Sequence, residues 1–199
     1  MYRRVLTAVG LLIGLCAPVP ALAAEVVAPA RPMILGLTTW FAASPAWTAT
    51  YNVSLSAPLG NTPWVLMTDY VPALGSGHLN VAHLFDLGPV TLAPSLGYRF
   101  FGPDARTIEL GPEARLGVIV RLMPWLHLWA GAGYSPILAN LNGGPAGSYL
   151  DLAASLVASY ERVSLAIGYG GLAFNADQAG NPYGALAMGG PTVGILTRF

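Results

Sequence analysis

The residues of this chain that could do chemistry are mainly charged side chains at alternate positions along short segments. Within each segment they share a face with Ser, Thr, Gly and Ala, opposite the large apolar residues. The charges on this face are Asp69, Arg99, Glu109, Glu113, Arg115, Arg121, Asp151, Glu161 and Arg198. If this face lines an enclosed space, the charges either form a selectivity ring in a channel or pair into a network that plugs the space.

Both alternatives stay open, and we favour the plug. Arg99 lies one segment before Glu109 and Glu113, where cross-strand pairing is geometrically reasonable. The planar fork of arginine also suits such buried pairing, because it meets carboxylates with two hydrogen bonds. The small Gly, Ala and Ser residues on the same face favour a pore instead, because they leave room for water or a thin solute.

An enzymatic role finds little support in these residues. The isolated histidines His78, His83 and His127 are more often packing or interface residues than ligands. His83 is not followed by the Ser and Asn that a lipid A deacylase of the outer-membrane type would show. We expect His78, Asp86 and Asp104 in the outer half of the molecule, the half that faces away from the cell, and nothing in the sequence pairs them. Nucleotide-binding loops, metal-ligand spacings and supported Ser-His-Asp arrangements are also missing. We therefore expect no catalytic residue, no cofactor and no metal.

The segments that carry the charges have the two-residue period of β-strands. In WTATYNVSLSA (47–57), for example, Tyr51 and Val53 alternate with Thr, Asn and Ser. Successive side chains of a strand point to opposite faces, so each segment has one apolar and one polar face. Turn-forming residues divide the chain into ten segments: 33–43, 46–57, 62–73, 77–87, 89–101, 106–122, 125–139, 148–160, 162–174 and 184–199.

The composition indicates that the apolar faces contact lipid. The chain is 54% hydrophobic, only 9% charged and contains no Lys, whereas globular proteins are about 25% charged. A soluble sandwich would carry charge on its exposed strands. A helical membrane protein would need long apolar stretches, and the nearest one, 117–134, is interrupted by Arg121, Pro124 and His127. The sequence predicts an all-β, transmembrane, antiparallel up-and-down β-barrel of ten strands. Eight strands are the alternative, if 77–87 folds into a loop and one other segment does not form a strand.

The N-terminal residues predict export from the cytoplasm. Arg3 and Arg4 precede an apolar stretch and a small-residue cleavage sequence at 21–23, so we interpret 1–23 as a secretory signal peptide. Residues 24–32 form a short Pro-rich periplasmic leader, and 33–199 the barrel. The only cysteine, Cys16, leaves with the signal, which excludes disulfides. Without the signal peptide, the chain has seven arginines and nine acidic residues. Its net charge is therefore slightly negative, which argues against a nucleic-acid partner.

The C-terminal stretch TVGILTRF (192–199) resembles the assembly signal of bacterial outer-membrane barrels. That signal combines a polar residue, a glycine two positions on and a terminal aromatic, here Thr192, Gly194 and Phe199. Thr197 departs from the pattern, because the family prefers a hydrophobic or aromatic residue there. The resemblance implies that the barrel-assembly machinery recognises this last strand during biogenesis.

Taken together, these features predict a monomeric integral protein of the bacterial outer membrane that contacts the lipids of that membrane. We expect a structural role or a narrow pore for small solutes. A membrane-embedded lipid-modifying enzyme and a surface-binding barrel are the alternatives.

Overall fold

The computed structural model describes residues 31–43, 47–102, 108–140, 147–176 and 186–199. Nearly all of them belong to β-strands, and one 3-10 turn, η1 (Pro72–Leu74), joins the third strand to the fourth. The strands are β1 (Ile34–Ala43), β2 (Trp47–Pro58), β3 (Trp64–Val71), β4 (Ser76–His83), β5 (Phe85–Asp86), β6 (Val90–Phe101), β7 (Glu109–Met123), β8 (Leu126–Asn140), β9 (Gly147–Tyr160), β10 (Val163–Ala176) and β11 (Leu186–Arg198). No helix in these ranges is long and apolar enough to cross a membrane.

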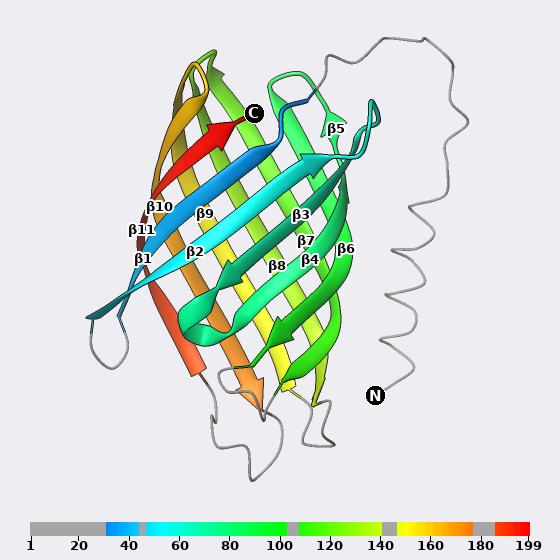
Figure 1. Cartoon of the computed structure of the whole chain (residues 1–199), viewed down its shortest axis with the longest axis vertical. Helices are drawn as coiled ribbons and strands as arrows, with labels where there is room; N and C mark the ends of the chain where they lie inside the picture. The colour runs from blue at the N-terminus through cyan, green and yellow to red at the C-terminus, as the bar shows by residue number, and fades with distance from the viewer. Residues whose placement is uncertain (1–30, 44–46, 103–107, 141–146, 177–185) are drawn as a thin grey trace.

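The strands close into a barrel by antiparallel pairing of neighbours (Figure 1). The first strand, β1, pairs with the last, β11, and β4 pairs with β6. The two-residue strand β5 pairs with β6 beside this junction, so the barrel itself has ten strands. The predicted ten-stranded up-and-down barrel is confirmed. The eight-stranded alternative is wrong, because residues 77–87 contribute β4 to the wall instead of forming a loop.

The alternation of side chains separates an apolar exterior from a polar interior. On β10, Leu165 and Ile167 are 56% and 66% exposed on the outer surface, whereas the alternate residues Ser164 and Ala166 face inward and are buried. The same holds on β6, where Tyr98 points outward and Arg99 inward. Large apolar side chains exposed this widely around the wall suit a hydrocarbon solvent.

The two ends of the barrel differ. One end, here the turn end, carries the short connections at 124–125 and 161–162 and the last residue, Phe199, and it lies at the top of Figure 1. The opposite end, where β6 ends and β7 begins, is here the loop end. Backbone hydrogen bonds tie the turn end together, for example from Ser159 N to Trp125 O at 2.7 Å.

Several aromatic side chains ring the turn end on the outer surface. Trp64 and Trp125 are about half exposed, and His83 lies between Trp64 and Phe85 with ring centroids 4.7 and 4.3 Å away. Aromatic rings at the rim of a barrel settle at the lipid headgroup level. Trp40 does not belong to such a girdle, because it is buried inside the barrel.

Candidate functional site: the barrel lumen

Four charges from three strands form one closed network in the lumen, here the charge ring. Its members are Arg99 on β6, Glu113 and Arg115 on β7, and Asp151 on β9. Arg99 donates from Nε and Nη2 to Glu113 Oε1 at 2.9 and 2.6 Å, and from Nη2 to Asp151 Oδ2. Arg115 Nη1 closes the ring to Asp151 Oδ2 at 2.7 Å and to Glu113 Oε1 at 3.2 Å. The two positive and two negative charges therefore alternate and balance.

Neighbouring residues hold the ring in place. Asn80 on β4 donates from Nδ2 to the other Glu113 oxygen, Oε2, at 2.7 Å. The guanidinium carbon of Arg99 lies 4.2 Å from the ring centre of Tyr149, a cation–π contact. Side-chain exposure is 3% for Arg99 and 0% for Glu113. Charges this deeply buried are tolerable because each is paired and hydrogen-bonded.

A glycine on β8 makes the space for the ring. A Cβ added at Gly133 would lie 2.5 Å from Arg115 Nη1 and 3.0 Å from Glu113 Oε1. Gly133 stands opposite both Arg115 and Asp151 in the strand register. The wall is therefore hollowed where the charges of β7 and β9 reach each other across β8.

A second polar group adjoins the ring on β2, β3 and β4. His78 Nδ1 lies 2.9 Å from Asp69 Oδ1 across the β3–β4 hairpin, and Asn52 Nδ2 donates to Asp69 Oδ2 at 3.4 Å. His78 also stands opposite Arg99 in the register. The pair with Asp69 was not expected from the sequence, in which His78 was treated as isolated and compared only with Asp86 and Asp104. A signal for the pair was available, because a tight 3-10 turn between the strands places Asp69 and His78 directly opposite each other.

An apolar layer fills the lumen on the loop-end side of the charge ring. It consists of buried side chains from β1, β6, β8, β9 and β10: Trp40, Phe101, Leu138, Tyr149, Leu172 and Phe174. Phe101 stacks on Phe174 with ring centroids 4.8 Å apart. Tyr149 belongs to both groups, since it contacts Phe101 on one side and Arg99 on the other. This layer was not expected from the sequence, because the two-residue alternation shows that an aromatic residue faces inward but not which inward residues pack together.

The other predicted lumen charges lie apart from the ring. Glu109 is buried at the start of β7, opposite Phe101. It does not pair with Arg99, which reaches Glu113 instead. Arg121 and Arg198 lie at the turn end. Glu161 occupies the exposed β9–β10 turn with φ of 49°, so its predicted place in the lumen is wrong.

Arg121 has a partner that the sequence analysis placed elsewhere. Its Nη2 donates to Asp86 Oδ2 at 2.9 Å, and both side chains are about half exposed. Asp86 lies on β5, close to the turn end, and not in the outer half where the sequence placed it. Asp104 lies outside the described residues. Among the described residues, no cluster of His, Cys, Asp or Glu is suited to holding a metal ion.

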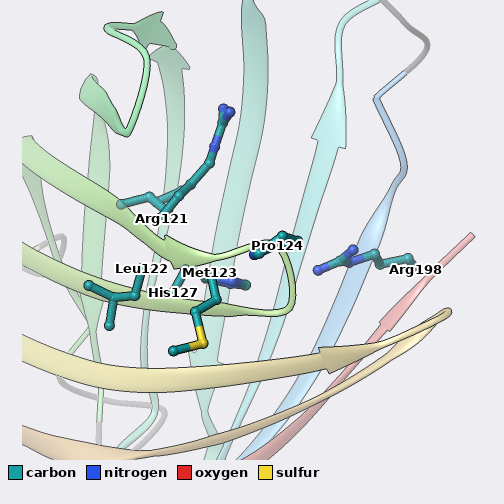
Figure 2. A pocket seen from close by; sticks show the side chains of 7 residues that line it. Arg121, Leu122, Met123, Pro124, His127 and Arg198 are labelled. Atoms are coloured by element: carbon teal, nitrogen blue, oxygen red, sulfur yellow. The ribbon is translucent and has the colours of Figure 1, made fainter.

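The turn-end mouth of the lumen contains a pocket of about 530 Å³ (Figure 2). Its lining combines the cationic side chains Arg121 and Arg198 with His127 and four apolar residues: Ile119, Leu122, Met123 and Pro124. The lumen thus has three layers along its axis, from an apolar layer through the charge ring to a mouth lined by basic residues.

Two residues of the expected assembly signal lie on the last strand, and the third directly follows that strand. Thr192 and Gly194 face inward, next to β1, and Phe199 is 64% exposed at the turn end. Phe199 N donates to Met33 O at 2.9 Å, which ties the last residue to the chain before β1. The barrel is therefore closed by the strand that carries this sequence.

A closed ten-stranded antiparallel barrel with an apolar exterior and a charged, polar interior is the architecture expected from the sequence. The fold is that of a small outer-membrane β-barrel. No family model matches the chain, and no curated protein matches it. Among solved structures, the barrel is similar to Ail, the attachment invasion locus protein of Yersinia pestis, at 12% identity and a TM-score of 0.32, over 85% of this chain and 97% of that chain.

Proposed function

We propose that this chain is an integral protein of the bacterial outer membrane with a structural role, and that its lumen is closed to solutes. The observation that carries the proposal is the stacking of two plugging layers. The charge ring joins β6 and β7 to β9 across the inner face of β8, and the polar group of Asn52, Asp69 and His78 continues it over β2 to β4. The apolar layer lies on the loop-end side of the ring.

Ion pairing also disfavours a selectivity role for the ring. A selectivity filter holds ligating groups free to exchange with passing ions. Here Glu113 Oε1 already accepts from both Arg99 and Arg115, and Oε2 accepts from Asn80. An ion would have to displace these charge-assisted hydrogen bonds, which are among the strongest in proteins.

The location in the outer membrane is supported by the apolar exterior of the barrel together with the predicted signal peptide, which lies outside the described residues. Outer-membrane lipids and, during biogenesis, the barrel-assembly machinery are the partners that this location implies. Cell fractionation tests it directly: the protein should float with the outer membrane and change its gel mobility on heating. Recovery in the soluble periplasmic fraction would contradict it.

Conductance in planar bilayers tests the closed lumen. The refolded protein should insert, as shown by heat-modifiable mobility of the recovered sample, and should give no discrete current steps. A matched variant with Trp40, Phe101 and Phe174 all changed to Ala removes most of the apolar layer and leaves the charge ring. This variant should also give no discrete current steps if the charge ring alone closes the lumen. Regular steps with a charge preference in the wild-type protein would overturn the proposal in favour of a narrow pore.

A further inference from the structure

The pocket at the turn-end mouth has a charge pattern that the closed lumen leaves unexplained. Its positive groups come from opposite parts of the wall, Arg121 from β7 and Arg198 from β11, with His127 of β8 between them (Figure 2). No acidic residue is among the described residues that line it. Unlike the charge ring, where signs alternate, the residues that line this pocket carry charge of one sign, and Asp86 contacts Arg121 from outside the lining.

Arg198 is positioned without being neutralised. Its Nη2 donates to Ser159 Oγ at 2.8 Å and to Ser164 Oγ at 3.4 Å, and these two hydroxyls are 2.8 Å apart. In the described part of the chain, no carboxylate lies within ion-pair distance of Arg198. The serine pair orients the guanidinium toward the mouth, and its charge is free to attract an anion.

Arg121 is only loosely held by its acidic partner. The ion pair with Asp86 is about half exposed on both sides, and such surface pairs contribute at most about 1 kcal/mol. An anion in the pocket can therefore compete for Arg121. A register irregularity between Arg121 and Met123 turns this end of β7, and Met123 and Arg121 both line the pocket.

The remaining lining is apolar. Ile119, Leu122, Met123 and Pro124 form one side of the pocket, and its volume of about 530 Å³ lies within the usual range of small-molecule sites. Two arginine forks match the oxygens of a phosphate or carboxylate, and the apolar side accommodates a short hydrocarbon group.

We propose that the turn-end mouth binds an amphipathic oxyanion, with the anionic group between Arg121 and Arg198 and a short apolar group against Ile119 and Met123. Two sources supply this chemistry. One is a soluble amphipathic anion that enters from the compartment facing the turn end. The other is the headgroup of an anionic phospholipid at the adjacent membrane surface.

Isothermal titration calorimetry with hexyl phosphate tests the site in the refolded protein, in a non-ionic maltoside detergent. Hexyl phosphate should bind saturably, and inorganic phosphate and 1-hexanol more weakly, since each supplies only half of the recognition. Arg198→Gln and Arg121→Gln should each weaken binding by about tenfold, as expected for a lost charge-assisted hydrogen bond.

Two control variants distinguish this site from general electrostatic attraction. Arg162→Gln removes an exposed arginine at the same end that does not line the pocket, and binding should not change. Asp86→Asn removes the carboxylate that competes for Arg121, and binding should stay equal or tighten. All variants should keep heat-modifiable mobility, so that a loss of binding is not a loss of fold.

The source is distinguished with the protein in vesicles. If phosphatidylglycerol in a phosphatidylcholine vesicle weakens hexyl phosphate binding, and the effect vanishes in Arg198→Gln, the lipid headgroup occupies the site. If the lipid has no effect, the occupant is a soluble anion. Equal loss of binding in Arg162→Gln and Arg198→Gln, or equal affinity for hexyl phosphate and 1-hexanol, would overturn the proposal.

Discussion

The stability of the barrel should depend strongly on Arg99, the most buried cation of the charge ring. Replacing it with Met keeps much of the side-chain volume but removes the charge. Glu113, with no exposed side-chain surface, and Asp151, with 15%, would then share Arg115 as their one remaining ring cation. Removing one partner of a buried ion pair costs about 3–5 kcal/mol, because one negative charge of the network is then left buried without a compensating cation.

The measurement is urea unfolding of the protein in lipid vesicles, followed by tryptophan fluorescence under conditions where unfolding and refolding curves coincide. With a urea slope of about 2 kcal/mol per molar, Arg99→Met should lower the unfolding midpoint by about 2 M. The matched control is Arg121→Met, whose ion pair with Asp86 is half exposed and should contribute less than about 1 kcal/mol. The double variant Arg99→Met with Glu113→Gln should recover part of the loss, because one unpaired carboxylate is removed along with the cation.

Equal midpoints for Arg99→Met and Arg121→Met would refute the plug. They would mean that water reaches the ring carboxylates and solvates them without the arginine. The lumen would then be hydrated through its middle, as in a pore.

Three further variants test other parts of the molecule. Gly133→Ala should lower the unfolding free energy by about 1–3 kcal/mol, because its Cβ would lie 2.5 Å from Arg115 Nη1; urea unfolding measures it. Phe174→Ala should lower it by about 3–5 kcal/mol, since this fully buried ring stacks on Phe101 and leaves a cavity. Deletion of Phe199 should reduce the amount of barrel in the outer membrane while export across the inner membrane continues, as measured by fractionation.

Each of these variants has a control. Gly170→Ala is also on an inward position, but its Cβ would meet ordinary contacts of 3.6 Å or more, so it should be nearly neutral. Tyr160→Ala removes an aromatic ring that is 78% exposed and should affect unfolding much less than Phe174→Ala. For Phe199, substitution by Tyr keeps an aromatic terminus and should assemble normally. Normal assembly of the deleted chain would count against a role for this residue.

The sequence by itself determined the barrel. The two-residue period assigns each side chain to the lipid or the lumen, and this local rule holds from the strand containing Tyr51 and Val53 to the last one. It placed Arg99, Glu113, Arg115 and Asp151 correctly on one face, because facing depends only on position along a strand. It failed for Glu161, where the strand had already ended in a turn.

Only the tertiary structure decided which inward residues meet. Pairing across the lumen depends on strand register and on the stagger between neighbouring strands, which no single segment specifies. That is why Arg99 contacts Glu113 and Asp151 and not Glu109, and why His78 lies beside Asp69. The same stagger stacks aromatic residues of distant strands into one layer and leaves Arg121 and Arg198 together at the mouth, because closing the barrel fixes the height of every strand relative to all the others.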